Sequence, residues 1–215
     1  MRTTKRNWTI EASAAAVILT ASFANADVTV TQGASGTTYG TTLNFDEAGG
    51  PVGNGLADNL FAGIGLSSLA SGDGNQRIGN FDAETGGWGM AGDTNSFTGF
   101  FGVFMTFDSD LTAFSGQVWD PSGPPSPMGG GGIVVAFDNG AEVANFSFGP
   151  AWGGFGDSWI DISTSGGMVF DEVRIVTFGF NPTTYVDNLS WNAVPSPSGV
   201  ALLGLGGLFG ARRRR

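Results

Sequence analysis

Residues 132–148 read GIVVAFDNGAEVANFSF. Two apolar runs flank Asn139-Gly140, a dipeptide that readily supplies the two positive-φ residues of a tight hairpin turn. With these two residues as the loop, three cross-strand pairs are expected on one apolar face. They are Phe137 with Glu142, Val135 with Ala144, and Ile133 with Phe146. The stretch therefore predicts an antiparallel hairpin that packs one face against a core.

Other strands are expected where short β-branched and aromatic runs lie between clusters of Gly, Pro, Asn and Asp. These runs are 37–45, 100–107, 112–119, 158–162, 168–177 and 185–191. The run 100–107 is apolar on both faces, which predicts a central strand covered on both sides. Residues 49–99 read as long loops with one helical turn around 56–60. About eight strands predict an all-β fold, a two-sheet antiparallel β-sandwich of the jelly-roll kind.

The composition excludes several kinds of chemistry. The 215 residues include neither Cys nor His, which rules out thiol nucleophiles, histidine bases, disulfides, and zinc sites built from thiolate or imidazole. Glycine contributes 37 residues, well above the usual share of about 7%. The hydrophobic content of 41% with 18 Phe is too high for a disordered chain. The sequence therefore predicts one compact, loop-rich domain.

The charges are distributed unevenly along the chain. Residues 27–193 contain 18 acidic residues and only two basic ones, Arg77 and Arg174, which gives a net charge of −16. Such a domain is repelled by nucleic acid and by anionic membrane surfaces. Oxygen-rich acidic surfaces do attract divalent cations. We therefore exclude nucleic acid as a partner.

Residues 1–26 have the three parts of a secretory signal peptide. The basic residues Arg2, Lys5 and Arg6 precede an apolar segment at 12–24. Ala24 and Ala26 form a small-x-small cleavage site. We expect cleavage after Ala26, so that the mature chain begins at Asp27. An uncleaved membrane anchor is the alternative, but the apolar run is shorter than the roughly 18–20 residues needed to span a bilayer.

Residues 194–215 form a second three-part segment. A proline-rich lead precedes the apolar residues 200–211, and a basic run ends the chain. As a helix, the apolar part would reach only about 18 Å, short of the roughly 30 Å hydrocarbon core. This length suits transient inner-membrane anchoring, with the basic run retained in the cytoplasm. The lead is Val194, Pro195, Ser196 and Pro197, and the basic run is Arg212, Arg213, Arg214 and Arg215.

This C-terminal segment resembles the PEP-CTERM sorting signal of bacterial exported proteins. Ser196 stands where that family has Glu. The resemblance implies processing by an exosortase-type membrane protease, and export to the cell envelope, the cell surface or the extracellular matrix. The chain then divides into a signal peptide (1–26), a β-sandwich ectodomain (27–193) and a sorting or anchor segment (194–215). A permanent C-terminal tail anchor is the alternative.

A metal site is expected near the end of the last strand. The strand period of two puts Asp187 on the same face as Leu189 and Trp191, and an inward carboxylate is costly unless it is paired or binds a metal. The segments 43–46 and 186–191 are similar to those of jelly-roll carbohydrate-binding modules. That resemblance implies a structural calcium ion held by Asp46, Glu47 and Asp187. Alternatively, Asp187 caps a turn or accepts backbone N–H groups.

Two tryptophans on glycine-flanked loops are candidates for ligand binding. Trp88 and Trp152 could each offer a flat apolar face to a sugar ring. The alternative is that they fill the open ends of the sandwich. Trp119, Trp159 and Trp191 fall in expected strands and are interpreted as core.

Three functions from different classes follow from these observations. The first is a non-enzymatic, exported envelope or matrix protein that binds polysaccharide. The second is a carbohydrate-active hydrolase or lyase, whose chemistry would require a carboxylate pair. No nucleophile, base and orienting group converge in the sequence, which favours a non-enzymatic protein. The third is a purely structural surface component.

Overall fold

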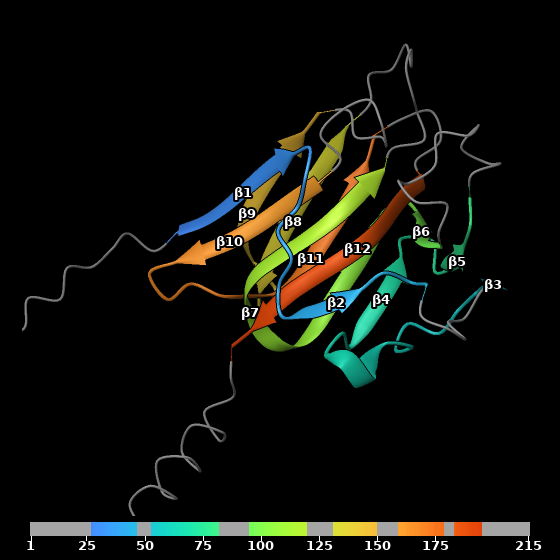
Figure 1. Cartoon of the computed structure of the whole chain (residues 1–215), viewed down its shortest axis with the longest axis horizontal. Coiled ribbons are helices and arrows are strands. Elements are labelled where there is room, and N and C mark those ends of the chain that lie inside the picture. The colour runs from blue at the N-terminus through green and yellow to red at the C-terminus, as the bar shows by residue number, and fades with distance from the viewer. Residues whose placement is uncertain are drawn as a thin grey trace, which may run out of the picture.

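The computed structural model describes residues 27–46, 53–81, 95–119, 131–149, 159–178 and 183–194. This part of the chain is almost entirely antiparallel β-structure, which confirms the predicted all-β sandwich (Figure 1). Its elements are β1 (Asp27–Gly33), β2 (Thr41–Leu43), β3 (Gly53–Asn54), the 3₁₀ helix η1 (Ala62–Ile64), β4 (Ser68–Ser71), β5 (Arg77–Gly79), β6 (Ser96–Phe100), β7 (Val103–Trp119), β8 (Gly132–Asp138), β9 (Ala141–Phe148), β10 (Trp159–Ser165), β11 (Phe170–Thr177) and β12 (Thr183–Ala193).

The 17-residue strand β7 belongs to both sheets of the sandwich. Its first half lies between β4 and β11, and its second half lies between β10 and β12. The front sheet therefore runs β1-β10-β7-β12, continues through β6, β5 and β3, and has β2 beside β12. The back sheet runs β4-β7-β11-β8-β9. In Figure 1, β8 and β9 lie behind β1 and β10.

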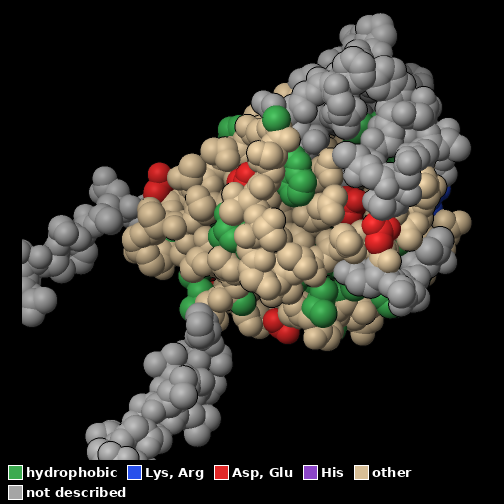
Figure 2. Space-filling model, viewed as in Figure 1, with side chains coloured by type: hydrophobic (Ala, Val, Ile, Leu, Met, Phe, Trp, Pro, Cys, Tyr) green, Lys and Arg blue, Asp and Glu red, His purple; other side chains and the backbone are tan. Residues whose placement is uncertain are grey.

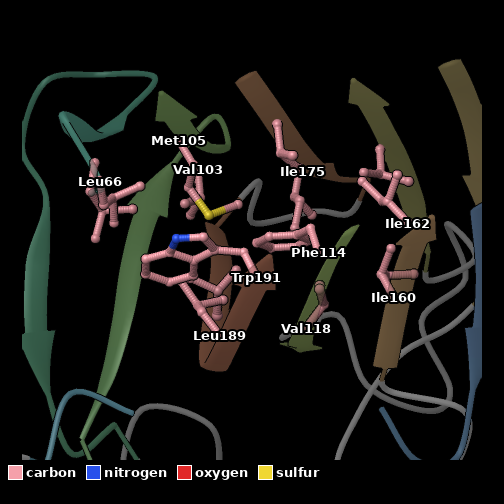
Figure 3. Packing of buried hydrophobic residues seen from close by; sticks show 14 of the residues in the cluster. Leu66, Val103, Met105, Phe114, Val118, Ile160, Ile162, Ile175, Leu189 and Trp191 are labelled. Atoms are coloured by element: carbon pink, nitrogen blue, oxygen red, sulfur yellow. The ribbon is translucent and has the colours of Figure 1, made fainter. Parts of the chain in front are cut away.

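The hydrophobic core lies between these two sheets. Trp191 of β12 packs its ring 5.3 Å from that of Phe107, which in turn lies 6.2 Å from Phe114. Figure 3 shows Trp191, Phe114 and Met105 converging at the centre of this layer. Ile160 and Ile162 extend the core along β10, and neither is exposed. Burial of large apolar side chains contributes roughly 1.5–3 kcal/mol each, which makes this layer the main source of stability.

The predicted hairpin is confirmed as β8 and β9, with Asn139 at φ 49 and Gly140 at φ 80 in its turn. Its predicted register is wrong beyond the first pair. Phe137 opposes Glu142, but a bulge follows, and Ala136 then opposes Ala144. The extra residue places Phe146 and Phe148 on the face of Val134 and Ala136, which is the face buried in the core.

Two other predictions about strands need correction. Residues 103–107 of the first expected run and the whole run 112–119 belong to one continuous strand, β7, whereas Phe100 ends β6. The first half of β7 is central as expected but buries only the face of Val103 and Met105 fully. Residues 49–99, expected to be loops, contain β3, β4, β5, β6 and η1 within their described part. These strands have two to five residues, too few to show a hydrophobic period. Pairing determines them instead: β4 pairs with β7, β6 with β12, and β5 lies between β6 and β3.

Asp187 does not share a face with Leu189 and Trp191, contrary to the prediction. It opposes Gln117, whereas Trp191 opposes Phe114, because the register shifts between Asp187 and Ser190. Asn188 lies within this bulge and has a φ of 48°. The bulge therefore turns Asp187 to the outer face of the front sheet, where it is nevertheless fully buried.

One edge of the sandwich is closed by a side chain. Gln32 of β1 donates from Nε2 to the carbonyl oxygen of Gly149 at 3.2 Å, and its Oε1 accepts from the Gly149 N–H at 2.8 Å. The amide therefore pairs with the backbone after β9 as a neighbouring peptide group would. This contact joins the edge strand of the front sheet to that of the back sheet.

The expected terminal signals, residues 1–26 and 195–215, lie outside the described residues. Strand β1 begins at Asp27, and after β12 the Val194 N–H donates to the carbonyl oxygen of Asp110 at 2.7 Å. Among the described residues, none forms a helix that is long and apolar enough to cross a membrane.

We predict that Ser115→Ala raises the free energy of unfolding by about 1 kcal/mol, because the buried Ser115 hydroxyl has no hydrogen-bond partner among the described residues and alanine removes this unsatisfied group. Urea denaturation measures the change. The control is Ser190→Ala, since the Ser190 hydroxyl donates to the Thr37 carbonyl at 2.9 Å and accepts from the Tyr39 N–H at 3.2 Å. That variant should lose about 1 kcal/mol or more. Equal losses in both variants would contradict the prediction.

Candidate functional site

The outer face of the front sheet carries a second, polar and aromatic layer. Trp119 and Tyr185 pack on this face with their rings 5.0 Å apart, and Phe81 lies 5.5 Å from Tyr185. Buried polar side chains surround them: Thr98, Ser115, Gln117, Asp187 and Ser190. Figure 1 shows residues 34–40, which link β1 to β2, crossing in front of the strands of this face. Two hollows open on the same face.

The first hollow, which we call the arginine hollow, has a volume of about 280 Å³. It lies over β5, β6 and β12 and over the turn that leads into β5. Strand pairing brings the lining residues together, because Thr98 opposes both Arg77 and Tyr185, and Phe100 opposes Thr183. The lining residues are Asp73, Asn75, Arg77, Thr98, Phe100, Thr183 and Tyr185.

Alternation along the chain positions the polar side of the arginine hollow. Asp73, Asn75 and Arg77 line it, while Gln76 between them is buried and donates to the carbonyl oxygen of Leu56. Gln76 therefore fixes the turn that leads into β5, and Asp73, Asn75 and Arg77 line the hollow from this turn and from the start of the strand. The half-buried ring of Phe100 forms part of the remaining wall.

Asp73 is held as a carboxylate. Its Oδ1 accepts a hydrogen bond from the Ser71 hydroxyl at 2.6 Å and another from the Asn75 N–H at 3.1 Å. The Ser71 bond is the main reason that the pKa of Asp73 lies below its ordinary value of 3.8. Both bonds use Oδ1, so Oδ2 is the acceptor that the described structure leaves for a ligand.

Arg77 is held against an aromatic ring. Its guanidinium carbon lies 4.8 Å from the ring centroid of Phe81, within the range of a cation–π contact. A planar donor of this kind pairs with two acceptor atoms at once. The arginine hollow therefore combines an acceptor-only side chain, a donor-only side chain and an amide with one aromatic wall.

The second hollow, which we call the tryptophan hollow, has a volume of about 260 Å³. It lies between β2, β10, the bulge of β12 and residues 34–40. No charged side chain lines it among the described residues. The lining residues are Thr37, Thr38, Thr42, Leu43, Asn44, Trp159, Asn188, Leu189 and Ser190.

A dense set of bonds surrounds Asn188 in the wall of the tryptophan hollow. Its Nδ2 donates to Gln117 Oε1 at 3.0 Å and to Asp187 Oδ2 at 3.3 Å. Its backbone N–H donates to Asp187 Oδ1 at 2.6 Å. The buried Asp187 carboxylate therefore holds the bulge residue in place, which agrees with the alternative that it accepts a backbone N–H.

The expected calcium site is only partly described. Asp46 Oδ1 accepts from the Asn95 N–H at 2.6 Å, Asp187 is bonded to Asn188, and Glu47 lies outside the described residues. Within the described ranges, no three acidic side chains gather closely enough to hold a metal ion. Calcium binding therefore stays a prediction. Trp88, Trp152, Pro195–Pro197 and Arg212–Arg215 also lie outside the described part of the chain.

Sequence reasoning missed the residues that line both hollows. Asp73, Asn75 and Arg77 fell in a stretch interpreted as loop, and the burial of Gln76 among them cannot be read from the sequence. Trp159 was interpreted as core, but it is half-buried on the outer face, because Ile160 and Ile162 are the core residues of β10.

Comparison with known proteins gives little further information. No protein-family model matches this sequence, and no curated protein matches it. Among solved structures, the chain is similar to TmCBM61, which was determined in complex with β-1,4-galactotriose. The TM-score is 0.28 at 8% identity, over 66% of this chain and 99% of TmCBM61. A likeness this weak supports no conclusion about a ligand of this chain.

We predict that Gly36→Ala lowers the free energy of unfolding by about 1–3 kcal/mol, the usual cost of overpacking. A methyl group at this position would lie 2.0 Å from Trp159 Cε3 and 2.5 Å from Ser115 Oγ, so that the indole must move. Denaturation measures the loss. Gly63→Ala is the matched control, since a methyl group there meets no atom within 4 Å. A neutral Gly36→Ala variant would show that Trp159 is not held against this glycine.

Proposed function

We propose that this chain is an exported, non-enzymatic protein of the cell envelope or extracellular matrix that binds polysaccharide through the arginine hollow. One observation carries the binding proposal. Asp73, Asn75 and Arg77, three planar polar side chains, alternate along one side of a hollow whose remaining wall includes the ring of Phe100.

This arrangement suits the chemistry of a sugar. Adjacent ring hydroxyls act as both donors and acceptors, so a carboxylate, an amide and a guanidinium can each pair with two of them. Hydrogen bonds to charged groups are the stronger kind, typically worth about 1.5–3 kcal/mol. An aromatic ring offers an apolar surface to the C–H face of the sugar. Because its pKa is lowered, Asp73 remains an acceptor in mildly acidic as well as neutral solution.

The number of carboxylates that line the arginine hollow favours binding over hydrolysis. Glycoside hydrolysis generally uses two carboxyl groups that flank the scissile bond. Among the described lining residues Asp73 is the single carboxylate, and Arg77 is the other charged group. The binding experiment below therefore also tests the two other functions, a carbohydrate-active hydrolase or lyase and a purely structural component.

The export proposal is supported by the terminal segments and by where the described strands start and end. Cleavage after Ala26 would keep every described residue of β1, which pairs with β10 from Asp27 opposite Ser165 onward. Removal of the tail beyond Val194 would likewise leave β12 whole, since that strand ends at Ala193. Processing by an exosortase-type membrane protease would then release the ectodomain outside the cell.

We predict that Arg77→Met weakens binding of a neutral soluble polysaccharide at least tenfold, because the variant keeps the apolar stem and loses the charged donors. Isothermal titration with a panel of glucans, galactans and mannans measures the loss. Arg174→Met is the matched control, since Arg174 also lies over aromatic rings, those of Phe104 and Phe137, but on the back sheet.

Each other outcome of this titration identifies a competing function. Release of sugar from the polysaccharide would favour the hydrolase or lyase. If both arginine variants weakened polysaccharide binding equally, the polymer would be attracted by positive charge in general and not bound at the arginine hollow. An absence of binding across the panel would leave the structural component.

We predict that the mature protein begins at Asp27 and lacks Arg212–Arg215. This expectation rests on the basic residues at the N-terminus, the cleavage site after Ala26 and the basic run at the C-terminus. Intact-mass analysis of protein isolated from the native envelope tests both ends at once. A mature chain that retains the C-terminal arginines would refute exosortase-type processing and leave the tail anchor.

A further inference from the structure

We infer that the tryptophan hollow is a second saccharide site, selective for neutral sugars and separate from the arginine hollow. The inference rests on the proposed function, because it assigns a further site and a ligand class to the same face of the front sheet.

The first argument is the chemistry of the lining. Six lining side chains are neutral hydroxyl or amide groups: Thr37, Thr38, Thr42, Asn44, Asn188 and Ser190. The indole of Trp159 adds a large apolar surface beside them. Neutral hydrogen-bonding groups around an aromatic surface match an uncharged sugar ring. The absence of a cation among these lining residues leaves nothing to bind a carboxylate or sulfate substituent.

The second argument is that the hollow is held in one shape. Gly36 packs directly against Trp159, and the segment that follows Gly36 is bonded to the front sheet. The Thr37 N–H donates to Asp161 Oδ1 at 3.0 Å, and the Ser190 hydroxyl donates to the Thr37 carbonyl at 2.9 Å. A preformed site loses little conformational freedom on binding, which favours affinity for a small ligand.

The third argument concerns Asn188. Its φ of 48° lies in the left-handed region, which is uncommon for a residue other than glycine and is maintained here by bonds to Gln117 and Asp187. Both side-chain bonds use Nδ2. The amide oxygen Oδ1 is therefore the acceptor left for a ligand hydroxyl, and Asp187 acts as a positioning residue through Asn188.

The two hollows share one strand. Tyr185 lines the arginine hollow and Asn188 lines the tryptophan hollow, three residues apart on β12. At about 3.3 Å per residue this spacing is about 10 Å. Asp187, which lies between these two residues along β12, and Gln117, which pairs with it, are both buried, so we treat the hollows as separate sites. Two sites on one face would allow a polymer to bind with higher avidity than a short oligosaccharide.

Isothermal titration of the full chain with neutral trisaccharides of β-linked glucose and of β-linked galactose tests the inference. We expect two trisaccharides per chain. Asn188→Gly should reduce this number to one, because glycine adopts the same φ and deletes only the amide. The matched control is Asn139→Gly at the hairpin turn, whose φ of 49° is almost the same; it should keep both sites.

A second variant guards against a change in folding. Trp159→Phe retains an aromatic ring and should weaken the same site at least threefold, and thermal melting checks that each variant is folded. The inference is supported if Asn188→Gly loses the second trisaccharide and Trp159→Phe binds it at least threefold more weakly, while Asn139→Gly keeps both sites unchanged.

The remaining outcomes separate this inference from the proposed function. One trisaccharide per chain, lost in Arg77→Met and kept in Asn188→Gly, overturns the second site and leaves the proposed function intact. One trisaccharide lost only in Asn188→Gly overturns the arginine hollow instead. If neither the unmodified chain nor any variant binds a trisaccharide, both the second site and the proposed function are overturned.

Discussion

The structure depends on the shared strand β7. All seven residues from Ala113 to Trp119 are buried, so this half of the strand is covered on both faces. Its even-numbered side chains, including Phe114 and Val118, enter the core between the sheets. Its odd-numbered side chains, including Gln117 and Trp119, enter the outer layer of the front sheet. One strand therefore sets the position of the core and of the layer beneath both hollows.

The bulge in β12 connects this constraint to the candidate sites. Without an extra residue at Asn188, strict alternation would turn Asp187 and Trp191 to the same face, and a carboxylate would enter the core at a high cost in free energy. Because of the bulge, the side chain of Trp191 lies in the core and that of Asp187 lies in the outer layer. The same irregularity shapes the wall of the tryptophan hollow, so a feature that protects the core also forms the surface proposed as a binding site.

Sequence reasoning succeeded where a local signal was strong and failed where pairing decided the outcome. Asn139-Gly140 fixed the hairpin, but nothing in its neighbours revealed the bulge that moves Phe146 to the core face. The same limit applied at Asp187, because strict alternation cannot include an inserted residue. Short strands such as β5 form because they pair with neighbouring strands, here β3 and β6. The arginine hollow was therefore not predictable, since its polar side was interpreted as loop.

The charge of the domain bears on which polysaccharide is the best candidate for the proposed ligand. Eighteen acidic residues and two arginines between 27 and 193 create a field that repels anionic polymers. Viewed from the front sheet, Figure 2 shows mostly neutral groups with acidic side chains scattered among them and almost no Lys or Arg. At physiological salt, charge acts over about 8 Å, so Arg77 can attract an acidic group only within its own hollow. A polymer that carries charge on every sugar is therefore repelled along most of its length, which favours a neutral chain as the ligand of this face.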